Sequence, residues 1–171
     1  ENVPLWLHRN LENYRFSSHL EYMNFSNATL GFMDFSDAEL QFSNLNNTTI
    51  FNSSFVESRA TGIKLSCADI IECNFSHSAL YDADMSNAII SSVDFSSASM
   101  QEMQIHDCRF SDSKLIDSEL NNSNLTNSVF NNTDCKGAIF ADCILTNTML
   151  IGANLVEADF SGAYMDGCNL S

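Results

Sequence analysis

A large apolar residue recurs at every fifth position of this chain. Of the 31 positions divisible by five between 20 and 170, 29 are Leu, Phe, Ile or Met, and the two exceptions are Ala60 and Cys135. A column of small residues lies two positions earlier: 25 of the 29 such positions between 28 and 168 are Ala, Ser, Thr or Cys. Because the register never slips, it predicts one repetitive domain over residues 20–171.

A period of five fits neither the 3.6 residues of a helical turn nor the two-residue alternation of a strand. The chain must therefore turn a corner about once per repeat, with the large residue inside, the small residue where the walls converge, and the other three positions outside. One repeat cannot bury its large residue alone, but stacked coils bury a continuous core through parallel backbone pairing. We expect an all-β solenoid.

The repeat has the form Ala-(Asp/Asn)-Leu-x-x at several places along the chain. In this it resembles the pentapeptide-repeat family, most clearly at Ala83-Asp84-Met85, Ala153-Asn154-Leu155 and Ala158-Asp159-Phe160. The resemblance covers residues 20–171. It implies a right-handed quadrilateral β-helix with four pentads per coil, a handedness that agrees with the general rule for parallel crossovers.

The two ends of the chain differ. Apolar residues before the repeats recur at near-helical spacing and predict a short amphipathic helix that caps the first coil within residues 1–19: Leu5, Trp6, Leu7, Leu11 and Tyr14. Outward aromatic residues near this end are expected to pack under that helix: Tyr22, Phe32 and Phe42. At the other end Met165 and Leu170 remain in register. We therefore expect an open edge, in a fragment of a longer protein or an end covered by a partner.

Charge and hydropathy exclude several classes of function. The chain has 22 acidic and 7 basic residues and a net charge of -15, which argues against a surface that binds nucleic acid directly. No apolar run reaches the roughly 20 residues of a membrane span, and the first residues lack the pattern of a signal peptide. We expect no membrane contact and a cytosolic location, or, if the protein is secreted, the cytosol of a host cell.

The residues that carry chemistry are few and scattered. Placing the six cysteines on a coil of four pentads leaves only Cys108 and Cys168 in one column, about 14 Å apart, which is too far for a disulfide. Five of the six point inward as small apolar fillers. His106-Asp107-Cys108 is the one cluster that hints at nucleophilic catalysis, but His106 points outward and Cys108 inward. We expect no enzyme activity in these residues, no metal, no cofactor and no small-molecule substrate.

The outward residues divide among four faces, numbered in chain order and centred on Leu20, Phe25, Leu30 and Phe35 and on the equivalent residues of later coils. Faces 4 and 1 hold 14 of the 20 acidic residues in the repeats. Face 3 has few charges, and apolar residues take outward positions there that the repeat normally leaves polar: Phe51, Ile71, Ile89, Val129, Met149 and Ile151. These six are the candidate partner-binding residues. The alternative is that β-branched residues merely suit a strand surface.

Two functions from different classes compete. In the first, the rod is a non-enzymatic recognition or scaffold module that docks a protein. The resemblance favours the partner-recognition domain of a bacterial effector, including effectors joined to HECT-like ubiquitin ligases. In the second, the acidic faces mimic DNA, as in the gyrase-protecting members of the family, although the carboxyl-terminal dimerisation helix and projecting loops of that group are missing. An inert spacer is a third interpretation.

Overall fold

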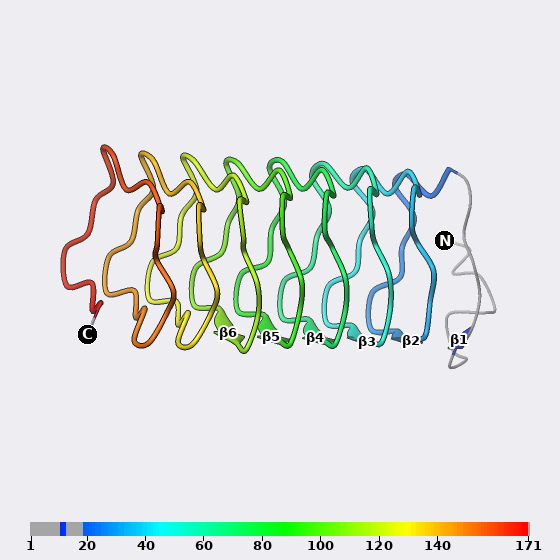
Figure 1. Cartoon of the computed structure of the whole chain (residues 1–171). Helices are drawn as coiled ribbons and strands as arrows, with labels where there is room; N and C mark the ends of the chain where they lie inside the picture. The colour runs from blue at the N-terminus through cyan, green and yellow to red at the C-terminus, as the bar shows by residue number, and fades with distance from the viewer. Residues whose placement is uncertain (1–10, 13–18, 171) are drawn as a thin grey trace.

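The computed structural model describes residues 11–12 and 19–170, and these wind into a rod of stacked coils (Figure 1). Six short strands pair in parallel and in chain order, β1-β2-β3-β4-β5-β6. They are β1 (Leu11–Glu12), β2 (Thr29–Gly31), β3 (Thr49–Phe51), β4 (Asp69–Ile71), β5 (Ile89–Ser91) and β6 (Arg109–Ser111). From β2 onward each strand residue pairs with its equivalent four pentads later, as in Leu30 with Ile50. The predicted all-β solenoid with four pentads per coil is confirmed.

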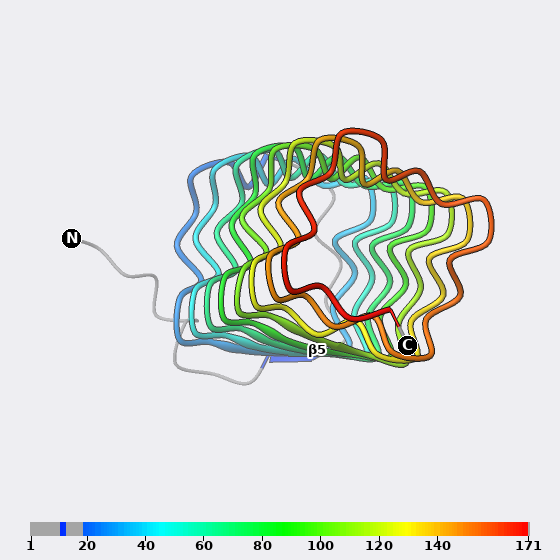
Figure 2. The ribbon, with the colours of Figure 1, turned by 90° about the vertical axis from the view of Figure 1, so that its left-hand side faces the viewer.

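The same ladder continues on every face as isolated parallel bridges, and it extends to the pair Met149 and Asn169. Viewed nearly along the rod, the coils nest on one another with matching corners (Figure 2). Within residues 11–12 and 19–170, three-residue strands form only on face 3, and there only as far as β6. Because every coil repeats the one before it, a residue has its nearest outward neighbours at the equivalent positions of the preceding and the following coil.

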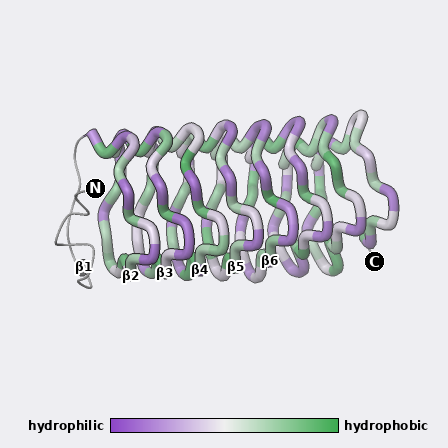
Figure 3. Tube along the Cα trace, turned by 180° about the vertical axis from the view of Figure 1, so that it is seen from behind, coloured by the Kyte–Doolittle hydropathy of each residue, from purple (hydrophilic) through white to green (hydrophobic). Residues whose placement is uncertain are grey.

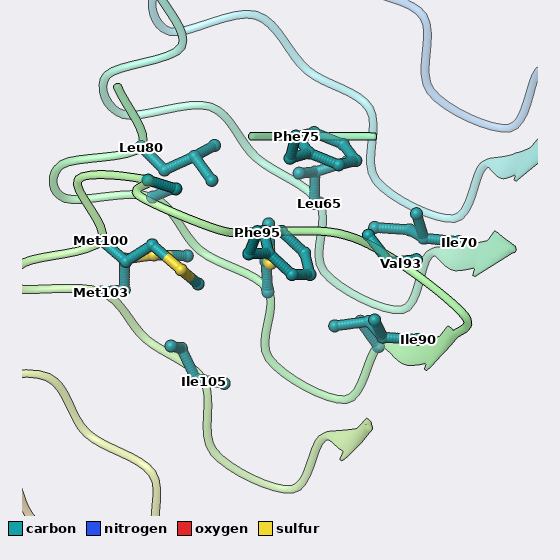
Figure 4. Packing of buried hydrophobic residues seen from close by; sticks show 14 of the residues in the cluster. Leu65, Ile70, Phe75, Leu80, Ile90, Val93, Phe95, Met100, Met103 and Ile105 are labelled. Atoms are coloured by element: carbon teal, nitrogen blue, oxygen red, sulfur yellow. The ribbon is translucent and has the colours of Figure 1, made fainter. Parts of the chain in front are cut away.

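The core consists of the large residues at every fifth position. All of them from Leu20 to Leu150 are buried. On face 4 the Phe rings stack: Phe75 lies 4.2 Å from Phe55 and 5.2 Å from Phe95, between ring centroids. Figure 4 shows Phe75 and Phe95 among neighbouring aliphatic side chains. Burial of one such side chain stabilises the fold by about 1.5–3 kcal/mol, so the column drives stacking of the coils.

Each corner uses a left-handed backbone conformation. Every position two residues after a large residue, from 22 to 167, has a positive φ, whether or not it is Gly. The amide one residue further on commonly donates back to the carbonyl of the large residue, as from Met23 to Leu20 at 3.2 Å. This closes a β-turn. One column of these corner positions consists largely of Asn, which tolerates left-handed backbone better than most residues: Asn27, Asn47, Asn87, Asn127 and Asn147.

Some corners lack that turn hydrogen bond, and the next coil replaces it. Met33, Val93 and Met103 are large residues in the small-residue column. In each case the serine hydroxyl at the equivalent position of the next coil accepts the backbone N–H: Ser53 from Met33 (3.0 Å), Ser113 from Val93 (3.1 Å) and Ser123 from Met103 (2.9 Å). Because a buried N–H needs a partner, these serines complete the corners of the preceding coil.

The two ends depart from the regular rod in different ways. Leu11, which we predicted to lie in a capping helix, is in strand β1 and pairs with Leu30 of β2, so the prediction is wrong at that residue. Strand pairing is found there because β2 offers a strand edge to the residues before it, although the partners lie 19 and not 20 residues apart. The other residues of the predicted cap lie outside the described residues. At the far end, the inward residues Phe160 and Met165 are half-buried, and Leu170 is exposed.

Candidate functional site

Face 3 is built from strands β2–β6 and from the equivalent positions of the coils that follow. In each coil the residues before and after the large residue point outward, since side chains alternate along a strand. A hydropathy-coloured trace shows this alternation of apolar and polar residues around each coil (Figure 3). Of the six predicted partner-binding residues, Ile71 is 39% and Ile89 51% exposed. The other four are half-buried: Phe51, Val129, Met149 and Ile151.

Phe51 is half-buried because it packs on its own face. Its ring lies over Gly31 of the preceding coil, where a Cβ would overlap it. It also meets Phe32 edge to face, with 5.4 Å between ring centroids. Phe51 therefore contributes to the packing of this end of the rod as well as to its surface, which the sequence alone did not indicate.

The six residues do not form one unbroken stripe. One outward column runs Asp69, Ile89, Arg109, Val129, Met149 through the parallel ladder, so Arg109 separates Ile89 from the two apolar residues beyond it. In the other column Phe51 and Ile71 are paired neighbours, and Ile151 lies several coils further along. The exposed apolar centre of face 3 is thus Ile71 and Ile89, on the adjacent strands β4 and β5 (Figure 1).

Exposed apolar side chains also occur away from face 3. Ile144 and Tyr164 pair on face 2 and are 46% and 60% exposed, and Val156 on face 4 is 56% exposed. Tyr22 and Phe42, which we expected under the cap, stack with their ring centroids 5.4 Å apart and remain 75% and 46% exposed. Any binding test on face 3 therefore has apolar controls on other faces.

The acidic faces 4 and 1 hold three cationic side chains that pair with carboxylates of the same rod. These contacts are Arg59–Glu39 at 3.0 Å, Lys114–Asp94 at 3.7 Å and Lys136–Glu157 at 3.9 Å. Each joins neighbouring coils. Since surface ion pairs contribute about 0–1 kcal/mol, they matter less for stability than for the field outside the rod, which stays strongly negative on this side.

One cluster has the composition of a metal site, and sequence reasoning missed it. Ligand atoms of His19, Glu21 and Glu39 lie within 4.8 Å of one another. The signal was available, because His19 and Glu39 occupy equivalent positions in successive coils. However, one oxygen of Glu39 accepts a hydrogen bond from Arg59 at 3.0 Å, and the other lies 3.5 Å from His19 Nε2. With a guanidinium on the shared carboxylate, the cluster is an ion-pair network.

The His106-Asp107-Cys108 cluster splits as its register predicts. His106 Nδ1 lies 2.9 Å from Asp107 Oδ2 on the surface, and the hydrogen bonds from His106 and Asn127 lower the pKa of Asp107. Cys108 is buried, and its Sγ donates to the carbonyl of Met85 at 2.8 Å. Burial raises the pKa of Cys108 to about 12, so the thiol stays protonated and the pair does not form a nucleophile and base.

The remaining cysteines follow the predicted placement closely. All six are free thiols, and four are buried: Cys73, Cys108, Cys135 and Cys143. Cys168 is half-buried, and Cys67 is exposed at a corner.

In the described residues, 11–12 and 19–170, no helix is long and apolar enough to cross a membrane.

Comparison with known proteins agrees with this geometry. The family model for pentapeptide repeats (8 copies) matches residues 68–102, 108–147 and 140–171. No curated protein is significantly similar in sequence. Among solved structures, a trypsin-treated variant of QnrB1, a plasmid-mediated fluoroquinolone resistance protein, is 16% identical with a TM-score of 0.52, over 90% of this chain and 89% of that one. HetL, a pentapeptide repeat protein involved in heterocyst differentiation regulation in Nostoc sp. strain PCC 7120, is 20% identical with a TM-score of 0.36, over 94% and 84%.

Proposed function

We propose, since the chain belongs to the pentapeptide-repeat family, that its solenoid is a non-enzymatic protein-binding module that contacts its partner through face 3. The observation that carries the proposal is the exposure of Ile71 and Ile89 on the adjacent strands β4 and β5. The partner-recognition domain of a bacterial effector, including one joined to a HECT-like ubiquitin ligase, is the specific form of this proposal that the sequence resemblance favours. In that form the partner is a protein of the host cytosol.

The physical properties of face 3 suit a contact surface. It carries three acidic residues, Asp69, Glu72 and Asp112, so docking there removes fewer charges from water than docking on faces 4 or 1. Its strands are held on both sides by the parallel ladder. A backbone that is already fixed loses little entropy when a partner binds, so more of the apolar burial appears as affinity.

A pull-down with two matched double variants tests this function. The Ile71→Ser/Ile89→Ser variant removes the apolar centre of face 3, and the Ile144→Ser/Val156→Ser variant removes exposed apolar side chains of similar size from faces 2 and 4. Because all four side chains are exposed, each change should alter stability by about 0.5 kcal/mol or less. Circular dichroism establishes that both variants are folded.

We expect wild type and the Ile144/Val156 variant to recover the same proteins from a cell lysate, and the Ile71/Ile89 variant to lose at least one of them. Recovery of every protein by both variants would mean that the apolar residues of face 3 do not bind a partner and are present because they suit a strand. Loss of the same proteins by both would mean that exposed apolar area in general, and not face 3, captures them.

A second candidate function rests on the acidic faces. Faces 4 and 1 carry 14 acidic and 3 basic residues. Seven coils at about 4.8 Å each make about 34 Å, which gives about one net negative charge per 3 Å, against one per about 1.7 Å of duplex DNA. This density, together with the fold shared with QnrB1, supports a DNA mimic that occupies a basic groove of gyrase.

Supercoiling by purified gyrase tests this candidate. The wild-type protein should inhibit the reaction, less so at higher salt, and the variant Asp37→Asn/Glu57→Gln/Asp117→Asn on face 4 should inhibit more weakly. The control variant Asp69→Asn/Glu72→Gln/Asp112→Asn removes three charges from face 3 and should inhibit as wild type does. Absence of inhibition by the wild type at high micromolar concentration would eliminate the DNA-mimic function.

A further inference from the structure

Strands β4, β5 and β6 place Asp69, Ile89 and Arg109 next to one another in a single outward column. Asp69 pairs with Ile89 and Ile89 with Arg109 in the parallel ladder, and all three residues are exposed. We propose that this column is the centre of a two-fold symmetric contact between two copies of the chain. In it Asp69 of each copy pairs with Arg109 of the other, and the two Ile89 side chains meet on the axis. The proposal rests on the proposed function of face 3 as a protein interface and adds a second copy of the chain as an occupant of that face.

Asp69 and Arg109 lack charged partners within the rod. Within residues 11–12 and 19–170, neither side chain forms an ion pair or a hydrogen bond, whereas Arg59, Lys114 and Lys136 each contact a carboxylate. Two coil steps of about 4.8 Å separate the Cα atoms of Asp69 and Arg109, and Ile89 stands between them. The two charges therefore remain available to a second molecule.

The order of the three residues is self-complementary. A two-fold axis that lies in the interface, runs across the rod and passes Ile89 reverses the order of the coils and keeps each column opposite itself. Asp69 then faces Arg109 of the other copy twice, and Ile89 faces Ile89, as an isologous interface requires. An axis shifted by half a coil would place Ile89 against Arg109 instead and leave both charges unpaired. The sequence of charges thus selects the position of the axis.

The net charge of -15 opposes association in general, but less in this orientation. Face 1, with seven of the acidic residues, lies opposite face 3 and would point away from the second copy. Glu72 and Asp112, at the corner where face 3 ends, would meet at the rim of the contact, where water and salt screen them. The strands that would meet are three residues each, so the contact is at the small end of protein interfaces, and we expect a reversible dimer.

Charge reversal on the full chain tests this contact. Sedimentation equilibrium from about 1 µM to about 1 mM should show the wild-type mass rising from 19.0 kDa toward twice that value. Asp69→Arg and Arg109→Asp should each raise the dissociation constant about a hundredfold, tenfold for each of the two symmetry-related contacts. The double variant Asp69→Arg/Arg109→Asp should regain wild-type association, because its reversed charges again face each other.

Two controls match the changes in net charge without touching the column. Asp166→Arg and Lys64→Asp lie on face 2 and should dimerise as wild type does. A wild type that remains at 19.0 kDa at every concentration would overturn the dimer and leave the pull-down prediction for face 3 standing. So would a double variant that fails to regain association although circular dichroism shows it to be folded. Conversely, a reversible dimer with no protein lost in the pull-down would confine face 3 to self-association.

Discussion

Ser123 offers a sharp test of how one coil supports another. Its side chain is fully buried in the small-residue column, and its Oγ accepts the backbone N–H of Met103 at 2.9 Å. The same hydroxyl donates to the carbonyl of Met100 at 2.9 Å. Replacing Ser123 by Ala removes both hydrogen bonds with almost no change of volume. The substitution therefore isolates the hydrogen-bonding contribution from that of packing.

The expected cost follows from the groups that are left behind. A buried polar group without a partner costs about 1–3 kcal/mol, so the amide of Met103 and the carbonyl of Met100 together should cost about 2–4 kcal/mol after local relaxation. The same column holds a matched control, Ser43, which is also fully buried but whose Oγ has no hydrogen-bond partner among the described residues. Ser43→Ala should change the free energy of unfolding by less than about 0.5 kcal/mol, or stabilise the fold slightly.

Urea unfolding at constant pH, followed by circular dichroism, measures the free energy of unfolding of both variants. In thermal unfolding, the midpoint of Ser123→Ala should lie roughly 5–15 °C below that of wild type. Hydrogen exchange of the Met103 amide gives a local measurement that does not require two-state unfolding, which long repeat arrays can violate. The amide should exchange faster in Ser123→Ala than in wild type. Equal losses in the two variants, or none in either, would refute the claim that serine hydroxyls complete the corners of the neighbouring coil.

Three further predictions address the core, the register and the thiols. Phe75→Ala removes a ring stacked between Phe55 and Phe95 and should cost about 3–5 kcal/mol in urea unfolding, whereas a loss below about 1 kcal/mol would contradict close stacking. Deleting Ser97 would turn every later large residue out of the core, so the thermal midpoint and circular dichroism should both change; a folded wild-type spectrum would disprove the five-residue register. Burial raises the pKa of four thiols to about 11–12: Cys73, Cys108, Cys135 and Cys143. The unfolded chain therefore loses its thiol protons first, and with reductant present the free energy of unfolding should fall above about pH 9 by up to about 1.4 kcal/mol per pH unit and thiol. The fall should be smaller in Cys108→Ala, and an equal fall in that variant would mean that groups other than these thiols cause it.

The inward residues of the fold could be predicted because their constraint is local and strict. One repeat of five places a large residue inside and a small one two positions earlier, and the structure buries both columns through Leu150. The predicted helix within residues 1–19 had no such repeat to support it. Leu11 has neighbours at helical spacing, but its strand partner Leu30 lies almost a full coil further along the chain, and pairing with an available edge outweighs a short amphipathic pattern.

The corners were predictable from the residue types at the outward positions two residues after each large residue. Most of the positions with positive φ between 22 and 167 are Asn, Asp or Gly, and none is Val, Ile or Thr. This is the composition expected of left-handed backbone, which β-branched residues avoid. One column of Asn already indicates corners. All positions with positive φ, taken together, give the corner of every pentad, including the corners at Phe32 and Phe42.

The candidate site was predictable in its position and not in its exposure. Once the coil is fixed at four pentads, the sequence assigns Ile71 and Ile89 to face 3, and the ladder agrees. How far an outward side chain is exposed depends on whether the equivalent residue of the neighbouring coil leaves room for it to pack. Phe51 is half-buried because Gly31 leaves room for its ring, and Arg109 interrupts the apolar column because it follows Ile89 in the ladder.

Where a residue departs from the repeat in this rod, the equivalent residue of the neighbouring coil commonly compensates for it by a hydrogen bond or by leaving space. A large residue at Met103 meets the hydroxyl of Ser123, and the ring of Phe42 lies over Gly62, where a Cβ would overlap it. Such pairs explain irregular residues within the chain itself. Ile89 departs from the repeat without such an answer: its neighbours in the column are the two opposite charges of Asp69 and Arg109. Because this exposed residue lies between two opposite charges that have no partners in the described part of the rod, a contact outside the rod accounts for it, and both proposals therefore include this column of face 3.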